Sequence, residues 1–347
     1  MLLLRQVTKL AAVAIAGALA LTACGGSSTD DASKQDKGVG LAFDVGGRGD
    51  NSFNDASYAG YEKALKEFGL KGKALTPREG ESNDDKVQRL TQLARDGYNP
   101  IIGVGFVYSD AISKVSKEFP DTSFAIIDDT QARGKNVANL VFSEEQGSFL
   151  VGMAAALKSK TGNVGFIGGV KTPLIEKFEA GFRQGVEYAK KGTKVQTKYL
   201  SAPPDMKGFN DAPGGREAAN GMMDAGADVI YAAAGASGDG AIQAIAKQKK
   251  WAIGVDKDQY QQKSLAPFKG VILTSMIKDA TGAVYEFIKS VHEKKPQSGI
   301  VEHDLSDGGI DYATSNPVFA KDKAILEKLE EAKKKIISGE IRVETTL

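Results

Sequence analysis

The sequence has a single cysteine, Cys24, and only two histidines, His292 and His303, among its 347 residues. One cysteine cannot build a disulfide framework within the chain. This inventory also argues against a zinc site and against a Cys/His nucleophile pair, so we expect neither a metal nor a cofactor. The chain also has almost no net charge, because its 45 Lys and Arg residues are balanced by 44 Asp and Glu residues. The balance predicts no nucleic-acid partner.

Only one apolar run is long enough to suggest a targeting segment, "LAAVAIAGALAL" at residues 10–21. Arg5 and Lys9 precede the run, and the small residues Thr22 and Ala23 follow it. This is the layout of a secretory signal peptide, and the run is too short for a stop-transfer helix. No later run approaches the length of a membrane span.

The stretch "LTAC" that ends this segment resembles the lipobox of bacterial lipoproteins. The resemblance implies a signal peptide over residues 1–23, cleavage before Cys24, and a diacylglycerol on the cysteine sulfur. The alternative is an unmodified cysteine just inside an ordinary export signal. A lipid anchor would hold the protein on the extracytoplasmic face of the cell membrane. The polar, Gly/Ser-rich stretch that follows predicts a flexible tether over residues 24–38.

From Val39 onward, short apolar runs alternate with amphipathic stretches. "GVGLAFDVGG" is typical of a strand, and "FNDASYAGYEKALKEFG" is typical of a helix that ends at Gly69. Repetition of this unit predicts an α/β fold of parallel sheets with helices on both faces. Near Glu144 a longer apolar helix interrupts the rhythm, and a second series of the same design begins. We therefore predict two lobes, 39–142 plus about 277–303, and 143–276 plus about 304–347.

Open parallel sheets bind ligands at the carboxyl ends of their strands, so the residues just after strands are the candidates. They are Asp44, Ser52, Phe53, Asn54, Phe106, Tyr108 and Asp128 in lobe one, and Phe178, Asp205, Gly235 and Asp256 in lobe two. Lys278 is a further candidate, after the strand "VILTSMI". Carboxylates and an amide suit a ligand rich in N–H and O–H donors. Aromatic rings suit a flat heterocycle that stacks on them. A nucleoside combines both features, with its base and its ribose diol.

Eight stretches of the chain resemble one known family. They are "FDVGGRGDNSFNDASYAGYEKAL", "FAIIDD", "SEEQGSFLVGMAAAL", "GFIGG", "FEAGFRQG", "GADVIYAAAG", "AIGVDKDQ" and "KKKIISGEIRV". In this order and spacing they resemble the basic membrane protein lipoproteins, nucleoside-binding proteins of the purine nucleoside receptor type that serve ABC importers. The resemblance implies a type I periplasmic-binding-protein fold, in which three crossovers join two Rossmann-like lobes.

The same resemblance implies roles for individual residues. Phe53 would stack on one face of the base, and Phe178 or else Phe209 on the other. Asn54 would bond the base edge together with Asp128 or its neighbour Asp129. The ribose would be held by Asp44, Gly235, Asp256 and Lys278.

We expect a monomer that closes on a nucleoside (guanosine, inosine or adenosine) without chemistry, because such a ligand would touch both lobes. The resemblance implies an ABC permease as the partner that receives it. Three alternatives remain at this point. A nucleoside hydrolase would cluster its aspartates around calcium, and here they are scattered one per strand end. A transcription regulator of related fold would need an N-terminal helix-turn-helix where this chain has an export signal. The same fold could also bind a sugar or a signalling molecule.

Overall fold

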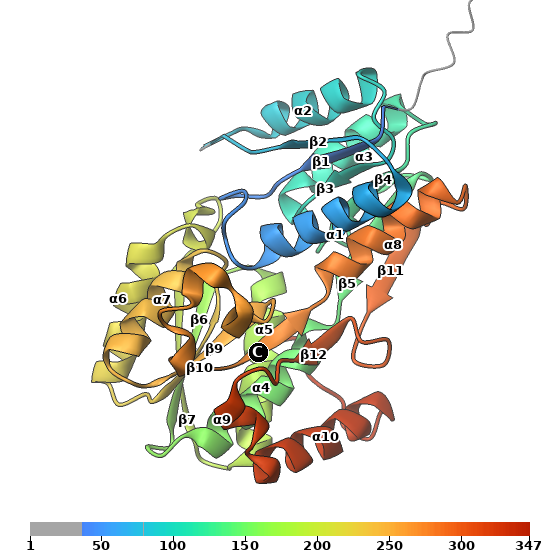
Figure 1. Ribbon diagram of the computed structural model, residues 1–347. Helices are drawn as coiled ribbons and strands as arrows, with labels where there is room; N and C mark the ends of the chain where they lie inside the picture. The colour runs from blue at the N-terminus through green and yellow to red at the C-terminus, as the bar shows by residue number, and fades with distance from the viewer. Residues whose placement is uncertain (1–36, 79) are drawn as a thin grey trace, which may run out of the picture. The chain divides into compact units, whose positions relative to one another are not determined.

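The computed structural model describes residues 37–78 and 80–347. The predicted signal peptide, Cys24 and nearly all of the predicted tether lie outside the described residues. The described chain holds two six-stranded sheets flanked by helices (Figure 1). Among these residues no helix is long and apolar enough to cross a membrane.

The first sheet has the strand order β11-β5-β4-β3-β1-β2, and every neighbouring pair is parallel. Its strands are β1 (Val39–Ala42), β2 (Gly72–Leu75), β3 (Ile101–Gly103), β4 (Phe124–Ile127), β5 (Val137–Phe142) and β11 (Gly299–His303). Its helices are α1 (Phe53–Phe68), α2 (Asn83–Arg95), α3 (Ser109–Glu118) and α8 (Ala280–His292). β1, β3 and β4 are buried throughout, which explains their uninterrupted apolar sequences.

The second sheet has the order β12-β10-β9-β8-β6-β7, and only the β10–β12 pair is antiparallel. Its strands are β6 (Asn163–Val170), β7 (Lys194–Ser201), β8 (Val229–Ala233), β9 (Trp251–Asp256), β10 (Ile272–Lys278) and β12 (Ile310–Tyr312). The remaining α-helices are α4 (Glu144–Lys158), α5 (Pro173–Ala189), α6 (Ala212–Asp224), α7 (Ser237–Lys247), α9 (Pro317–Ala320) and α10 (Lys323–Ile337). Short 3₁₀ turns are η1 (Phe106–Tyr108), η2 (Lys207–Phe209), η3 (Gln259–Gln261), η4 (Lys263–Leu265) and η5 (Lys269–Val271).

The predicted fold of two parallel-sheet α/β lobes is confirmed. We call the first sheet with its helices lobe one and the second lobe two. The chain passes between the sheets three times, after β5, between β10 and β11, and between β11 and β12. The lobe boundaries predicted from the sequence stay a prediction.

Local sequence explains where the helices begin and end. α1 stops at Gly69, which adopts the left-handed conformation (φ 66°) that costs glycine least. α2 starts with a capping box, in which Ser82 and Asp85 satisfy each other's backbone N–H groups.

Small residues let two pairs of helices approach closely. A Cβ atom on Gly181 of α5 would lie 2.1 Å from the carbonyl oxygen of Glu145 in α4. Likewise, a Cβ on Gly60 of α1 would lie 2.2 Å from the carbonyl oxygen of Thr281 in α8. The packing of α4 against α5 and of α1 against α8 therefore depends on these glycines.

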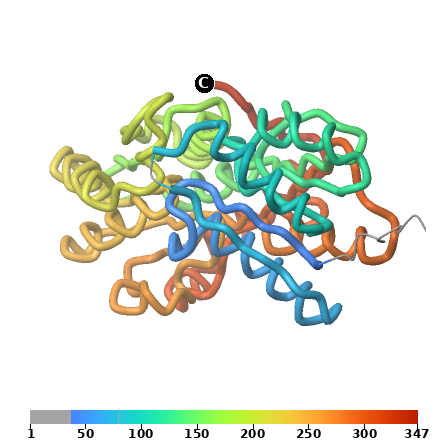
Figure 2. Tube along the Cα trace, turned by 90° about the horizontal axis from the view of Figure 1, so that it is seen from above, coloured from blue at the N-terminus to red at the C-terminus, as the bar shows by residue number. Residues whose placement is uncertain are grey.

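The C-terminal segment lies along α5, at the red end of the trace in Figure 2. The side chain of Gln184 donates to the carbonyl oxygen of Arg342 (3.0 Å) and accepts from the backbone N–H of Glu344 (2.8 Å). Ile341 and Val343 pack against the core beside it.

Candidate functional site

One cavity takes its walls from both lobes. Residues after β1, β3 and β4 line it from lobe one, and residues after β6 and at the carboxyl ends of β8, β9 and β10 line it from lobe two. All eight residues predicted to bind ligand are among its walls: Asp44, Phe53, Asn54, Asp128, Phe178, Gly235, Asp256 and Lys278. The structure thus brings them together, while their contact with a ligand stays a prediction.

Lys278 lies at the centre of the charged groups. Its Nζ is 2.5 Å from Oδ2 of Asp128, 3.6 Å from Oε1 of Glu144 and 3.9 Å from Oδ1 of Asp256. Burial opposes the charged form of Lys278, yet the three carboxylates together raise its pKa. The ammonium also lies 4.7 Å from the ring centroid of Phe53. Lys278 is therefore a buried, charged group that interacts with carboxylates of both lobes.

Asp128 follows β4 in a left-handed conformation (φ 64°), which a short polar side chain tolerates best. Its Oδ2 binds Lys278, while its buried Oδ1 has no hydrogen-bond partner among the described residues. Burial raises the pKa of Asp128, and Lys278 opposes this shift. An unpartnered buried carboxylate oxygen is costly, so this atom is well suited to accept a hydrogen bond from a ligand.

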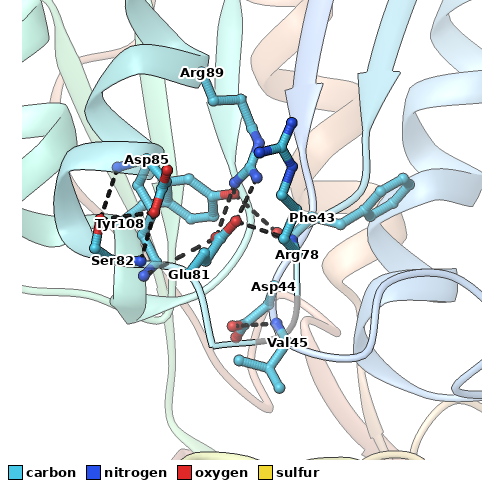
Figure 3. A network of polar contacts seen from close by, with 10 residues as sticks. Phe43, Asp44, Val45, Arg78, Glu81, Ser82, Asp85, Arg89 and Tyr108 are labelled. Atoms are coloured by element: carbon cyan, nitrogen blue, oxygen red, sulfur yellow. Dashed lines mark hydrogen bonds and ion pairs between the residues drawn. The ribbon is translucent and has the colours of Figure 1, made fainter.

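Asp44 follows β1, and a network of polar contacts holds the end of that strand in place (Figure 3). The hydroxyl of Tyr108 donates to the carbonyl oxygen of Phe43 (3.0 Å), and Arg89 donates to Tyr108 (2.7 Å) and pairs with Glu81. Burial raises the pKa of Asp44 to about 7.

Gly105 makes room for Asp44. A Cβ atom at position 105 would lie 2.1 Å from Oδ2 of Asp44, and the residue has a φ of +89°. Both the space and the backbone conformation therefore require glycine at this position.

The Asn54 side chain is less available to a ligand than the sequence suggested, because its polar atoms already have partners within the protein. Its Oδ1 accepts from the backbone N–H of Asp44 (2.9 Å), and its Nδ2 donates to Asp50 (3.1 Å). The Asp50 carboxylate also accepts from the backbone N–H groups of Ser52, Asn54 and Asp55. Burial raises the pKa of Asp50 to about 6. Asn54 thus joins β1 to the start of α1, and its contact with a ligand would be secondary to this task.

Four phenyl rings line the cavity, those of Phe53, Phe106, Phe178 and Phe209. Phe178 is almost fully buried, and the Lys278 ammonium lies 5.5 Å from its centroid. Phe209 packs against Gly169, where a Cβ would lie 2.5 Å from its ring. Because both rings reach the cavity, either Phe178 or Phe209 could face the opposite side of a ligand from Phe53.

Asp256 is a carboxyl group that lobe two contributes to the cavity walls. It ends β9 with a φ of +63° and accepts a short hydrogen bond from the hydroxyl of Ser52 in lobe one. Burial raises the pKa of Asp256, and Lys278 and Ser52 oppose this shift. Next to it, Gly235 follows β8 with a φ of +54°.

Some candidates lie outside the cavity walls. Tyr108 is buried in the network that supports β1, and Asp205 is exposed and accepts from the backbone N–H of Lys207 (3.0 Å). Asp129 caps its own loop by accepting from the backbone N–H groups of Gln131 and Ala132. Of the two adjacent aspartates, Asp128 is therefore the one that lines the cavity.

Sequence reasoning missed three contributors, Asp50, Gly105 and Glu144. Asp50 carried a signal, because an aspartate shortly before a helix is a common cap. Gly105 and Glu144 carried no such signal, since their roles depend on Asp44 and Lys278, which are distant in the sequence.

Within residues 37–78 and 80–347, no group of three or more His, Cys, Asp or Glu side chains is arranged to hold a metal ion.

Comparison with known proteins identifies the family. Residues 37–346 match the Bmp family, described as "ABC transporter substrate-binding protein PnrA-like". The chain belongs to this family. It is 35% identical to the CD4+ T-cell-stimulating antigen of Listeria innocua, over 95% of each protein. It is also 31% identical to the ABC transporter nucleoside-binding protein BmpA of Lactococcus lactis, over 98% of this chain and 99% of that protein.

Solved structures agree with the Bmp assignment. An ABC transporter solute-binding protein from Aeropyrum pernix is 28% identical and superposes with a TM-score of 0.78, covering 89% of this chain and 93% of that one. A glucose-galactose binding protein from Geobacillus stearothermophilus, at 16% identity and a TM-score of 0.56, shares the fold alone. The chain is thus a substrate-binding protein of the kind that serves ABC transporters, and its family is not one of enzymes.

Proposed function

We propose that this protein captures purine nucleosides in the cavity between its lobes and delivers them to an ABC importer. The single observation that carries the proposal is the composition of this cavity, in which phenyl rings adjoin buried carboxyls and one lysine. The rings suit a flat base, and the carboxyls suit the N–H groups of the base and the hydroxyls of ribose. The name of the Lactococcus lactis relative supports the same ligand class.

Electrostatics narrows the ligand further. The cavity walls hold four carboxyl groups, those of Asp44, Asp50, Asp128 and Asp256, and a single ammonium, that of Lys278. Burial raises the pKa of each of these carboxyls, because the cavity disfavours negative charge. A phosphate would add like charge at low dielectric, so we expect nucleosides to bind and nucleotides to be rejected.

We further propose that the chain is anchored through a lipid on Cys24, on the extracytoplasmic face of the membrane. The lipobox-like "LTAC" supports this, as do relatives named as lipoproteins, among them one from Pyrococcus furiosus that is 32% identical over 79% of this chain. The anchor would keep the binding protein close to its permease.

Calorimetry tests the ligand directly. The protein is titrated with guanosine, inosine, adenosine, the free bases and pentoses. We expect all three nucleosides to bind, with guanosine and inosine at least as tight as adenosine, because an ionised Asp128 accepts from their N1–H. Free bases should bind far more weakly, since Asp256 and Lys278 would be left without the ribose. Binding of pentoses alone would favour the sugar alternative, and equal affinity for guanine and guanosine would contradict the ribose assignment.

A further inference from the structure

The loop before α1 is the place where the two lobes make a compact group of hydrogen bonds. Asn51 of lobe one donates from Nδ2 to Oδ2 of Asp239 in α7 (2.7 Å). Its Oδ1 accepts from the hydroxyl of Ser264 in η4 (2.6 Å), and its carbonyl oxygen accepts from Nε2 of Gln259 in η3 (3.2 Å). All three partners belong to lobe two, so one buried residue of lobe one holds three separate segments of the other lobe.

Lobe one shapes this loop by itself. The backbone N–H of Asn51 donates to Oδ2 of Asp55 (3.1 Å), and the Asp50 carboxylate accepts from the N–H groups that follow. Asn51 adopts a left-handed conformation (φ 50°) that asparagine tolerates better than most residues. The donor and the acceptor of its side chain are thus aimed at lobe two by contacts within lobe one.

Contacts within lobe two likewise position a partner of Asn51. Gln259 is buried and donates its backbone N–H to the hydroxyl of Ser275 (3.1 Å), while its Oε1 accepts from the N–H of Val255 (3.3 Å). The other carboxylate oxygen of Asp239 is buried without a hydrogen-bond partner among the described residues. Within the described part of the chain, the bond to Asn51 is therefore the one direct hydrogen bond to this carboxylate.

These four residues join the lobes without lining the cavity. Asn51, Asp239, Gln259 and Ser264 are all absent from the cavity walls. The next residue in the chain, Ser52, donates to Asp256, which does line the cavity. We call Asn51, Asp239, Gln259 and Ser264 the latch. The latch is connected to the candidate ligand site through Ser52, which directly follows Asn51 in the chain.

We infer that Asn51 is a positioning residue whose bonds to lobe two stabilise the closed form and thereby set how slowly a captured ligand leaves. The inference rests on the proposed function, in that the ligand occupies the cavity. Bonds that exist only when the lobes meet shift the equilibrium toward closure. Because the ligand enters before these bonds form, their loss should appear in dissociation more than in association.

The test compares Asn51→Gly with wild type by stopped-flow binding of guanosine. Glycine keeps the left-handed backbone and the carbonyl oxygen but removes both side-chain bonds. We expect the dissociation rate to rise on the order of tenfold or more, since one lost bond involves a charged group, with the association rate changed less than about twofold. Ser264→Ala, on the opposite lobe, should raise the dissociation rate by several-fold. Gln92→Ala, an exposed residue of α2 bonded only within lobe one, is the matched control.

A second measurement needs no nucleoside. Small-angle scattering of the unliganded full chain should give a larger radius of gyration for Asn51→Gly than for wild type or Gln92→Ala. An unchanged dissociation rate, or an affinity loss caused by slower association, would overturn the inference. If wild type binds no nucleoside, the proposed function fails, and the scattering comparison alone decides on the latch.

Discussion

Nζ of Lys278, at the end of β10 in lobe two, lies 2.5 Å from Oδ2 of Asp128, which follows β4 in lobe one, although 150 positions separate them. Both side chains are almost completely buried. This ion pair crosses the boundary between the lobes inside the candidate ligand site. It therefore contributes both to the charge balance of the cavity and to the contact between the lobes.

Replacing the buried cation should be costly. Lys278→Met leaves Asp128, Asp256 and Glu144 without their common partner, so we expect the free energy of unfolding to fall by about 3–5 kcal/mol at neutral pH. The loss should shrink toward pH 5, where Asp128 and Asp256 take up protons because burial raises their pKa values. Chemical denaturation at both pH values measures it. Lys289→Met, which removes an exposed pair with Glu286, should cost less than about 1 kcal/mol, and equal losses would contradict the central role of Lys278.

Stability of the unliganded protein should depend on pH through Asp44. Its pKa is about 7 in the folded protein, above the ordinary value of 3.8, because burial disfavours the charged form. A raised folded pKa means that the native state holds the proton more tightly than the unfolded state. The contribution to stability is therefore complete below about pH 4 and is lost as the pH rises through about 7.

Asp44→Asn tests this linkage because it cannot ionise. Between pH 5 and pH 8, the melting temperature of the wild type should fall more than that of the variant. Identical pH profiles would show that Asp44 keeps its ordinary pKa in the folded protein.

Loss of the Phe53 ring should weaken ligand binding. We expect Phe53→Ala to lower the affinity for guanosine by about ten- to a hundredfold, because base stacking on an aromatic ring is worth about 1–3 kcal/mol. Phe53→Tyr keeps the ring face and should retain most of the affinity. Calorimetry on both variants separates stacking from a general disturbance of the site. An alanine variant that binds as tightly as wild type would exclude Phe53 as a stacking partner.

The position of Asp44 should depend on Gly105. Gly105→Ala adds a Cβ only 2.1 Å from Oδ2 of Asp44 at a φ of +89°, so the carboxylate must move. We expect lower thermal stability together with weaker nucleoside binding. Gly270→Ala is the control, since a Cβ there meets nothing within 4 Å. If both variants behave like wild type, the close contact between Gly105 and Asp44 is not required.

Membrane attachment should depend on Cys24. Replacement by serine removes the sulfur that would carry the lipid, so Cys24→Ser should appear in soluble or uncleaved form. Fractionation of cells and measurement of the processed mass check both outcomes. A serine variant that is processed and anchored like wild type would disprove lipid attachment at this residue.

Asparagine 54 shows where inference from sequence was incomplete. Its place at the start of a helix after a strand correctly put it in the cavity wall. Its bonds to the backbone of Asp44 and to Asp50 could not be foreseen, because they depend on how the turn between β1 and α1 folds back. The same limit applies to Tyr108, whose place after a strand resembled that of Phe106 although it turns into the core.

The sequence by itself determined the alternation of strands and helices, the two-lobed fold and the set of residues at the carboxyl ends of the strands. These follow from apolar periodicity, glycine stops and local caps, which act over a few residues. Only the tertiary structure decided that Lys278 meets Asp128 and that Asn51 meets Asp239. Such pairs join segments far apart in the chain, and they depend on the packing of one lobe against the other, which no local pattern encodes.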